Sequence, residues 1–321
     1  MKVAAAIATL LAVLFSFVAH AQPYPSKPIT MIIPFPPGGA THPIGRLLAN
    51  GMSKSLGQNV ILDTKAGAGG AIGHAYVARQ APNGYTIMFT ASSLVTIPVA
   101  DEVNGRPASY KMSQITPIAL IAADPQLLLV PAGSKWKTLA DLITDAKANP
   151  GSIKYSSAGI YGTSHTAFEM FAQAAGIDLL HVPYQGAGPS ILALLANEVD
   201  MTAVTPAVGL VHVKAGKVRA LASWGATRLP NIADIPTMKE LGIDAEFYSW
   251  IGVFGPADMP SDVLAALRKA VRSAVQEEEF RKGMVTLDTA INNMEGPQFE
   301  AFLERDTRRN AALIRRIGKT Q

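Results

Sequence analysis

The residues with the clearest chemical potential lie in the segment IIPFPPGGATH, residues 32–42, where an apolar run meets prolines and two glycines. Gly38 and Gly39 let the backbone approach a ligand closely, because glycine has no side chain. Thr41 and His42 then open a helix-like stretch, and the first amides of a helix are unpaired and attract anions. The segment is therefore either an anion site or a tight strand–helix turn that Thr41 caps.

A second segment, SSAGIYGTSHT at residues 156–166, has the same design. Gly162 leads into Thr163, Ser164 and His165 at the expected start of another helix. Hydroxyls and free amides at this point can hold a carboxylate, although Ser and Thr are also ordinary helix caps. One such loop in each half of the chain favours a shared ligand site over two unrelated caps.

Enzyme chemistry receives little support from the sequence. Ser164 precedes His165, but neighbours at a helix start point apart, and the chain has no G-x-S-x-G elbow. In ILDTKAGAGGAIGHA, Gly67 and Gly69 are followed by Ile72 where the dinucleotide fingerprint needs glycine, and no acid follows about 20 residues later. We therefore expect neither a hydrolase triad nor a nucleotide cofactor.

Metal binding and disulfide bonding are also disfavoured. The six histidines lack the spacing of a zinc site, and the chain contains no cysteine. We expect no metal and no cofactor. A composition with 49% hydrophobic and 16% charged residues is that of a folded globular protein. The formal net charge of +4 is compatible with an anionic ligand. The basic segment ERDTRRNAALIRR has mixed sign and helical spacing, so we expect no nucleic-acid partner.

The elements that must position these loops alternate along the chain, which predicts an α/β fold with parallel strands. Expected strands lie at 29–35, 59–65 and 85–92, with helices at 42–57 and 69–81 between them. Long β-rich runs at 115–131 and 246–256 bracket a second set of alternations, and helices at 261–283 and roughly 297–317 end the chain.

This organisation predicts two lobes joined by crossing strands, with a ligand cleft between them. Residues 22–122 plus 249–321 form the first predicted lobe, and residues 123–248 form the second. Ligands of open α/β sheets bind beyond the carboxyl ends of the strands, so facing lobes would close on a shared ligand by hinge motion.

The first 21 residues, MKVAAAIATLLAVLFSFVAHA, have the pattern of a secretory signal peptide. A lysine precedes an apolar run, and an A-x-A signature predicts cleavage after Ala21. The apolar run is short for a membrane anchor, which is the alternative interpretation.

Ordered motifs along almost the whole chain resemble the Bug-type (TctC-like) solute receptors of tripartite tricarboxylate transporters. The matching stretches are YPSKPITMIIPFPPGGAT, LGQNVILDTKAGAGGAIG, APNGYTIMFTAS, YSSAGIYGTSH, VPYQGAGPSILALLANEVD, KAGKVRALASWGATR, IPTMKELG and SWIGVFGP. The resemblance implies a two-lobed periplasmic binding protein, not an enzyme, that delivers an organic acid to a membrane permease. We expect it to act as a monomer.

The resemblance also implies the site, in which two loops hold a carboxylate through amides and hydroxyls. The implied positions are Phe35, Gly38, Gly39 and Thr41 in the first loop, and Gly162, Thr163 and Ser164 in the second. Ser92 and Thr205 are further cleft candidates, and Asp200 is expected to orient the wall or bridge to the ligand through water.

One position departs from the family pattern. These receptors usually have aspartate after the threonine of the first loop, where this chain has His42 followed by Pro43. Histidine can donate to a second carboxylate or stack on an aromatic ring, so we expect a dicarboxylate, with terephthalate as an aromatic example. The alternatives are a secreted α/β hydrolase or oxidoreductase, and a signalling adaptor that shares the receptor body.

Overall fold

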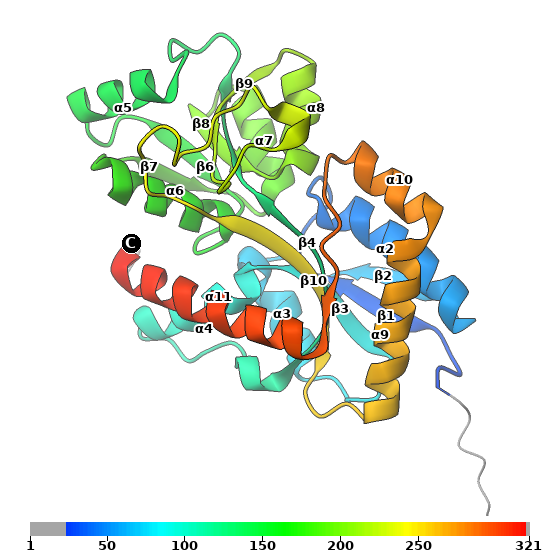
Figure 1. The fold of residues 1–321 in the computed structure, drawn as a ribbon. Coiled ribbons are helices and arrows are strands. Elements are labelled where there is room, and N and C mark those ends of the chain that lie inside the picture. Colours follow the sequence, from blue (N-terminus) through cyan, green and yellow to red (C-terminus); the bar gives the residue numbers. More distant parts are fainter. Residues whose placement is uncertain (1–23, 319–321) are drawn as a thin grey trace, which may run out of the picture.

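Two β-sheets, each packed against helices, build two lobes that are joined by crossing strands (Figure 1). The α/β class predicted from the alternating pattern is confirmed. The computed structural model describes residues 24–318, so the predicted signal peptide and its cleavage site lie outside the described residues. Within residues 24–318, no helix has the length and apolar character needed to cross a membrane.

The first lobe contains a six-stranded sheet in the order β11-β4-β10-β3-β1-β2. Its strands are β1 (Ile29–Ile33), β2 (Val60–Thr64), β3 (Thr86–Ala91), β4 (Ile115–Pro125), β10 (Tyr248–Pro256) and β11 (Met294–Glu295). Strand β1 pairs in parallel with β2 and β3, whereas β10 pairs antiparallel with β3 and β4. The carboxyl ends of β1 and β3 therefore meet at one edge of this sheet.

Helices pack on both faces of the first sheet. They are α2 (Thr41–Leu56), α3 (Ala71–Ala78), α4 (Ser93–Val103), α9 (Ser261–Gln276), α10 (Glu278–Thr286) and α11 (Gly296–Ile317), with 3-10 turns η1 (Ala68–Gly70) and η2 (Met112–Gln114). Helix α9 buries Val263, Leu267, Val271 and Val275, which recur every four residues and so share one face. This face joins α2 and the sheet in one apolar core.

The second lobe contains a five-stranded sheet in the order β7-β6-β8-β5-β9. Its strands are β5 (Leu127–Pro131), β6 (Lys154–Ser157), β7 (Leu180–Pro183), β8 (Met201–Val204) and β9 (Val218–Ser223). Its helices are α5 (Leu139–Ala148), α6 (Thr163–Ala175), α7 (Ala187–Leu195) and α8 (Pro206–Lys214), with the 3-10 turn η3 (Pro230–Ile232). Strands β6, β7 and β8 are parallel, so the helices that follow them start at the same sheet edge.

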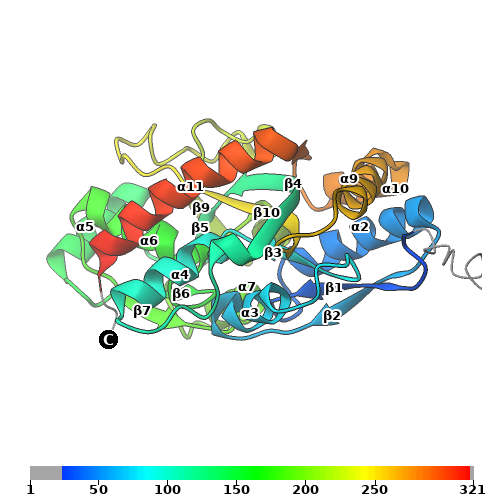
Figure 2. The same ribbon diagram turned by 90° about the horizontal axis from the view of Figure 1, so that it is seen from below.

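The hinge lies where β4 continues into β5 and where the chain returns through β10 (Figure 1). Strand β4 stays in the first sheet as far as Pro125, which pairs with Tyr248, so the crossing comes later than the predicted boundary between 122 and 123. Helix α11 runs beside α4 and reaches α6 of the other lobe (Figure 2). The Trp250 indole nitrogen anchors α11 by donating to the Asp306 carboxylate at 2.7 Å.

Two elements differ from the sequence prediction. The helix expected at 261–283 is divided into α9 and α10, because Glu277 adopts an extended conformation with ψ of 137°. Helix α4 was not predicted, since β-branched residues and Pro98 disfavour helix. Pro98 cannot donate to the carbonyl of Leu94, and the Tyr110 hydroxyl donates to that carbonyl instead, at 2.7 Å. Tertiary contacts therefore replace the missing helical hydrogen bond.

Asp124 lies on the hinge strand β4 and generates a stability prediction. It is buried, and burial raises its pKa to about 7, although hydrogen bonds from Thr289 and the Ala290 amide oppose the shift. In the unfolded chain the carboxyl ionises near its ordinary value of 3.8. Because the folded state keeps the proton longer, the stability contributed by this group falls as pH rises from about 4 to above 7.

We expect Asp124→Asn to stabilise the protein at pH 8 by about 3 kcal/mol more than at pH 4, since asparagine cannot ionise. Denaturant unfolding of both proteins at the two pH values measures this difference. The exposed Asp244→Asn should show no such pH-dependent gain. A gain from Asp124→Asn that is equal at both pH values would contradict the assignment.

Candidate ligand-binding site

A cavity of about 80 Å³ lies between the lobes, at the edges where the parallel strands end. Its wall from the first lobe consists of Phe35, Pro36, Gly39, Ala40, Thr41, Ala91, Ser249 and Ile251. Its wall from the second lobe consists of Ala158, Thr163, Ser164, Ala187, Ala203, Val204, Thr205 and Val208, and Gln126 of the hinge completes it. The cavity therefore draws on both lobes and on the strand that joins them.

Four helices begin at this cavity. Helix α2 starts at Thr41, α6 at Thr163, α7 at Ala187 and α8 directly after Thr205. None of these four starts has a side-chain cap. Pro43, Pro189 and Pro206 lack an N–H group, and the Val208 amide donates to the Thr205 carbonyl at 3.0 Å. The other first-turn amides have no partner within their helices, and the helix dipoles place positive potential at this end. The arrangement concentrates main-chain hydrogen-bond donors around one small volume.

The described residues that line the cavity include no aspartate, glutamate, lysine, arginine or histidine. The hydroxyls of Thr41, Thr163 and Thr205 have no hydrogen-bond partner within residues 24–318, and they add donors to the amides. The remaining wall is mostly alanine, valine and isoleucine. Such a site can bind negative oxygens through amides and hydroxyls, and its apolar wall can hold a short carbon chain.

The sequence-predicted residues divide into two groups. The structure brings Phe35, Gly39, Thr41, Thr163, Ser164 and Thr205 together in the cavity wall. Gly38, Gly162 and Ser92 are not among the lining residues, and the buried Ser92 follows Ala91 of the wall. Gly38 has φ of +98°, which favours glycine, and it packs against Gly188 of the other lobe. The Gly162 carbonyl accepts from the amide and the hydroxyl of Thr166 in the first turn of α6.

Two predicted positions need correction, and the first is His42. His42 is not among the residues that line the cavity, and its Nε2 donates to the Phe35 carbonyl oxygen at 2.9 Å. The histidine thereby closes the loop that carries Phe35. The expectation that His42 contacts a second carboxylate or stacks on an aromatic ligand loses its geometric basis.

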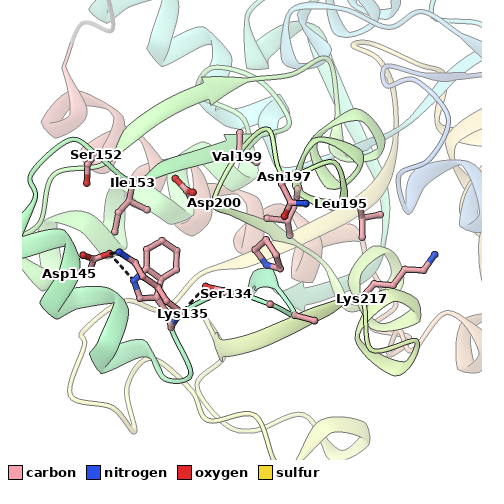
Figure 3. A pocket seen from close by; sticks show the side chains of 15 residues that line it. Ser134, Lys135, Asp145, Ser152, Ile153, Leu195, Asn197, Val199, Asp200 and Lys217 are labelled. Atoms are coloured by element: carbon pink, nitrogen blue, oxygen red, sulfur yellow. Dashed lines mark hydrogen bonds and ion pairs between the residues drawn. The ribbon is translucent and has the colours of Figure 1, made fainter.

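The second correction concerns Asp200, which lies before β8, whereas the cavity meets the other end of that strand at Val204 and Thr205. The Asp200 carboxylate accepts from the Lys154 amide at 2.8 Å and so ties β8 to β6. Asp200 lines a separate surface hollow of about 630 Å³ (Figure 3). In this hollow Lys135 is paired with Asp145 at 2.7 Å.

Eleven of the residues that line the cavity were not predicted, and three of them show what signal the sequence offered. Ala187 lies within the glycine-rich segment YQGAG, residues 184–188, which has the same strand–glycine–helix signature as the two predicted loops and could have been found from it. Gln126 and Ser249 sit in apolar β-rich runs, where an isolated polar residue is the only signal in the sequence. Their position at the cavity depends on how the two lobes pair.

The enzyme alternative receives no support from the second loop. Ser164 Oγ accepts from the Ala158 amide at 2.8 Å, and no hydrogen bond joins it to His165 within the described residues. His165 Nδ1 instead accepts from the Tyr161 amide at 2.9 Å. Burial, with a smaller effect of His181, lowers the pKa of His165 to about 3, so the ring is neutral. These contacts hold the shape of the loop.

The lobes are in contact around the cavity. A Cβ placed on Gly188 of α7 would lie 2.8 Å from the Pro37 carbonyl oxygen and 3.0 Å from the Gly38 Cα. Thr96 Oγ1 donates across the lobes to the Tyr161 carbonyl at 2.7 Å. The structure is therefore a closed arrangement in which main chain of one lobe meets main chain of the other.

The geometry is that of a two-lobed binding protein with the periplasmic-binding-protein fold. The family model for the tripartite tricarboxylate transporter family receptor (TctC) matches residues 44–319, and the chain belongs to this family. The UPF0065 protein in the tcbD-tcbE intergenic region of Pseudomonas sp. (strain P51) is 36% identical over 78% of this chain and 75% of its own length. Protein BugT of Bordetella pertussis is 30% identical over 96% of this chain and 97% of its own length.

Solved structures agree with this assignment. The periplasmic binding protein BugD has a TM-score of 0.84 at 29% identity, with 91% of this chain and 98% of BugD covered. MatC from Rhodopseudomonas palustris with bound malate has a TM-score of 0.83 at 25% identity, covering 91% and 100%. R. palustris Rpa4515 with adipate has a TM-score of 0.84 at 26% identity, covering 91% and 98%. The family and these neighbours are binding proteins, which confirms the prediction that the chain is not an enzyme.

The contact at Gly188 generates a prediction about closure. We expect Gly188→Ala to leave the fold intact, because alanine suits the first turn of α7, but to hold the lobes apart at the Pro37 carbonyl. Ligand affinity should fall about tenfold, which is ~1.4 kcal/mol, and the ligand-induced decrease in radius of gyration should be smaller. Calorimetry and small-angle X-ray scattering measure these two effects.

The matched control is Gly133→Ala in the same lobe, where an added Cβ would meet no heavy atom within 4 Å. This variant should bind and close like the parent protein. Normal compaction and affinity in Gly188→Ala would show that the glycine contact does not limit closure.

Proposed function

We propose that this protein captures a small aliphatic dicarboxylate between its lobes in the periplasm and delivers it to the permease of a tripartite tricarboxylate transporter. The observation that carries the proposal is that four helices from the two lobes, none with a side-chain cap, start at one cavity. Among the described residues, none that lines this cavity has a charged side chain. Membership of the receptor family supports the transport role. The signal-peptide pattern ending at Ala21 supports export.

The two ends of a dicarboxylate have natural partners in this cavity. One carboxylate binds the amides and hydroxyls at the starts of α2 and α6, at Thr41, Thr163 and Ser164. The other binds the starts of α7 and α8, near Ala187 and Thr205. The alanine, valine and isoleucine side chains of the wall pack against the carbon chain between them. Bound malate in MatC and adipate in Rpa4515 support a dicarboxylate as the ligand class.

An aliphatic ligand is favoured over an aromatic one such as terephthalate. The cavity of about 80 Å³ is narrow, and the His42 ring is committed to the Phe35 carbonyl. No lining side chain is acidic, so the ammonium group of an amino acid would lack a counter-charge. Ligand binding then shifts the population from the open form to the closed form, because a ligand that touches both lobes binds the closed form more tightly.

A thermal-shift screen tests the ligand class. Aliphatic dicarboxylates should raise the melting temperature, by an amount that grows with the logarithm of their concentration above Kd, because they bind only the folded protein. Terephthalate, sugars and nucleotides should shift it less or not at all. Stabilisation by sugars or nucleotides, without any carboxylate effect, would refute the proposal.

The assignment of the carboxylate to the start of α6 predicts the effect of Thr163→Val. Loss of one hydroxyl to a charged acceptor costs about 1.5–3 kcal/mol, so calorimetry should show affinity about 10- to 100-fold weaker. Thr144→Val on the exposed face of α5 is the matched control, and it should bind normally. Unchanged affinity in Thr163→Val would remove this loop from the carboxylate site.

A further inference from the structure

One buried polar side chain in the cavity wall has no assigned role. Gln126 is 2% exposed and lines the cavity, and its side-chain oxygen has no hydrogen-bond partner among the described residues. No hydrogen bond of its amide nitrogen is found in the same part of the chain. A buried, unpaired amide oxygen costs about 1–3 kcal/mol, so such groups are normally paired. The ligand is the group that can supply the partner.

Main-chain contacts fix the position of Gln126 in the cavity wall. It stands between the end of β4 at Pro125 and the start of β5 at Leu127, on the crossing between the lobes. Its carbonyl accepts from the Trp224 amide at 3.0 Å. Ser249 of the other crossing strand pairs with Asp124 and lines the same cavity. The side chain of Gln126 is therefore free to serve a ligand, while its main chain is anchored.

The chemistry of the primary amide selects the ligand group. It presents one acceptor and one donor side by side, whereas a carboxylate offers only acceptors. A 2-hydroxycarboxylate offers a donor, the hydroxyl, next to an acceptor, the carboxylate, so it can satisfy both atoms of the amide at once. An ammonium group is also a donor, but no acidic side chain lines the cavity to balance its charge.

We propose that Gln126 makes this site selective for dicarboxylates that carry a hydroxyl on the carbon next to a carboxylate, over the same acids without the hydroxyl. The inference rests on the proposed function, because it places one more recognition element in the same cavity. Gln126 is in this view a specificity-determining residue, whereas the helix starts bind the carboxylates of any diacid.

Calorimetric titration with malate and succinate, which differ by a single hydroxyl, tests the inference. The unaltered protein should bind malate at least about tenfold more tightly than succinate, since succinate leaves the amide oxygen unpaired. In Gln126→Met, a variant of similar length without hydrogen-bonding groups, malate should weaken until the two affinities agree within about threefold. If five-carbon diacids bind better, 2-hydroxyglutarate and glutarate replace this pair.

Thr205→Val provides the matched control, because Thr205 lines the cavity but is assigned to a carboxylate and not to the hydroxyl. It should weaken both ligands and keep their ratio. The melting temperature of each variant without ligand shows that it is folded.

The outcomes separate the two proposals. If no carboxylate binds the unaltered protein, the proposed function fails. If both diacids bind it equally, or if the preference survives in Gln126→Met, only the role of Gln126 fails. Tighter binding of aspartate than of malate would overturn the hydroxyl assignment, because it would show that the donor to the Gln126 side-chain oxygen is an ammonium group.

Discussion

The constraint on which the structure depends is that unpaired main-chain amides from both lobes must share one small volume. The helices that start at Thr41, Thr163 and Ala187 and after Thr205 bring positive dipole ends together without side-chain caps. Amides buried without partners are costly, so the closed state is most favourable when an anion satisfies them. The same groups therefore provide both affinity for a carboxylate and a reason for the lobes to close on it.

This arrangement requires backbone to approach backbone, which explains the glycines where the two lobes touch. Gly38 meets Gly188 across the lobes, and Gly159 lies against Gly69, where an added Cβ would come within 3.1 Å of the Cα. Side chains at these points would collide with the backbone of the other lobe and push the two loops apart. At Gly38, Gly69 and Gly159 a positive φ also favours glycine, whereas at Gly188 the close approach of the two lobes is the reason for glycine.

Local signatures made much of this site predictable from the sequence. Glycine and hydroxyl residues between a strand and a helix identify Gly39, Thr41 and Thr163, because the strand end, the turn and the helix start are all encoded within a few residues. The direction of the His42 ring was not predictable, since it depends on a carbonyl of the folded loop. The place of Gln126 was not predictable either, because it requires the pairing of two lobes.

The lining residues are divided between the hinge and the lobes, and this division affects the kinetics of ligand binding. Gln126 and Ser249 belong to the crossing strands, whereas the helix starts belong to the moving lobes. A ligand that enters an open cleft can meet the hinge residues before the second lobe arrives, so the hydroxyl that we propose Gln126 recognises would be met at an early stage of binding. Closure then adds the remaining amides, whose contacts are lost only when the lobes reopen. We therefore expect ligand contacts with the hinge residues to discriminate between ligands before closure. Ligand contacts with the helix starts of the lobes should mainly slow the release of the ligand.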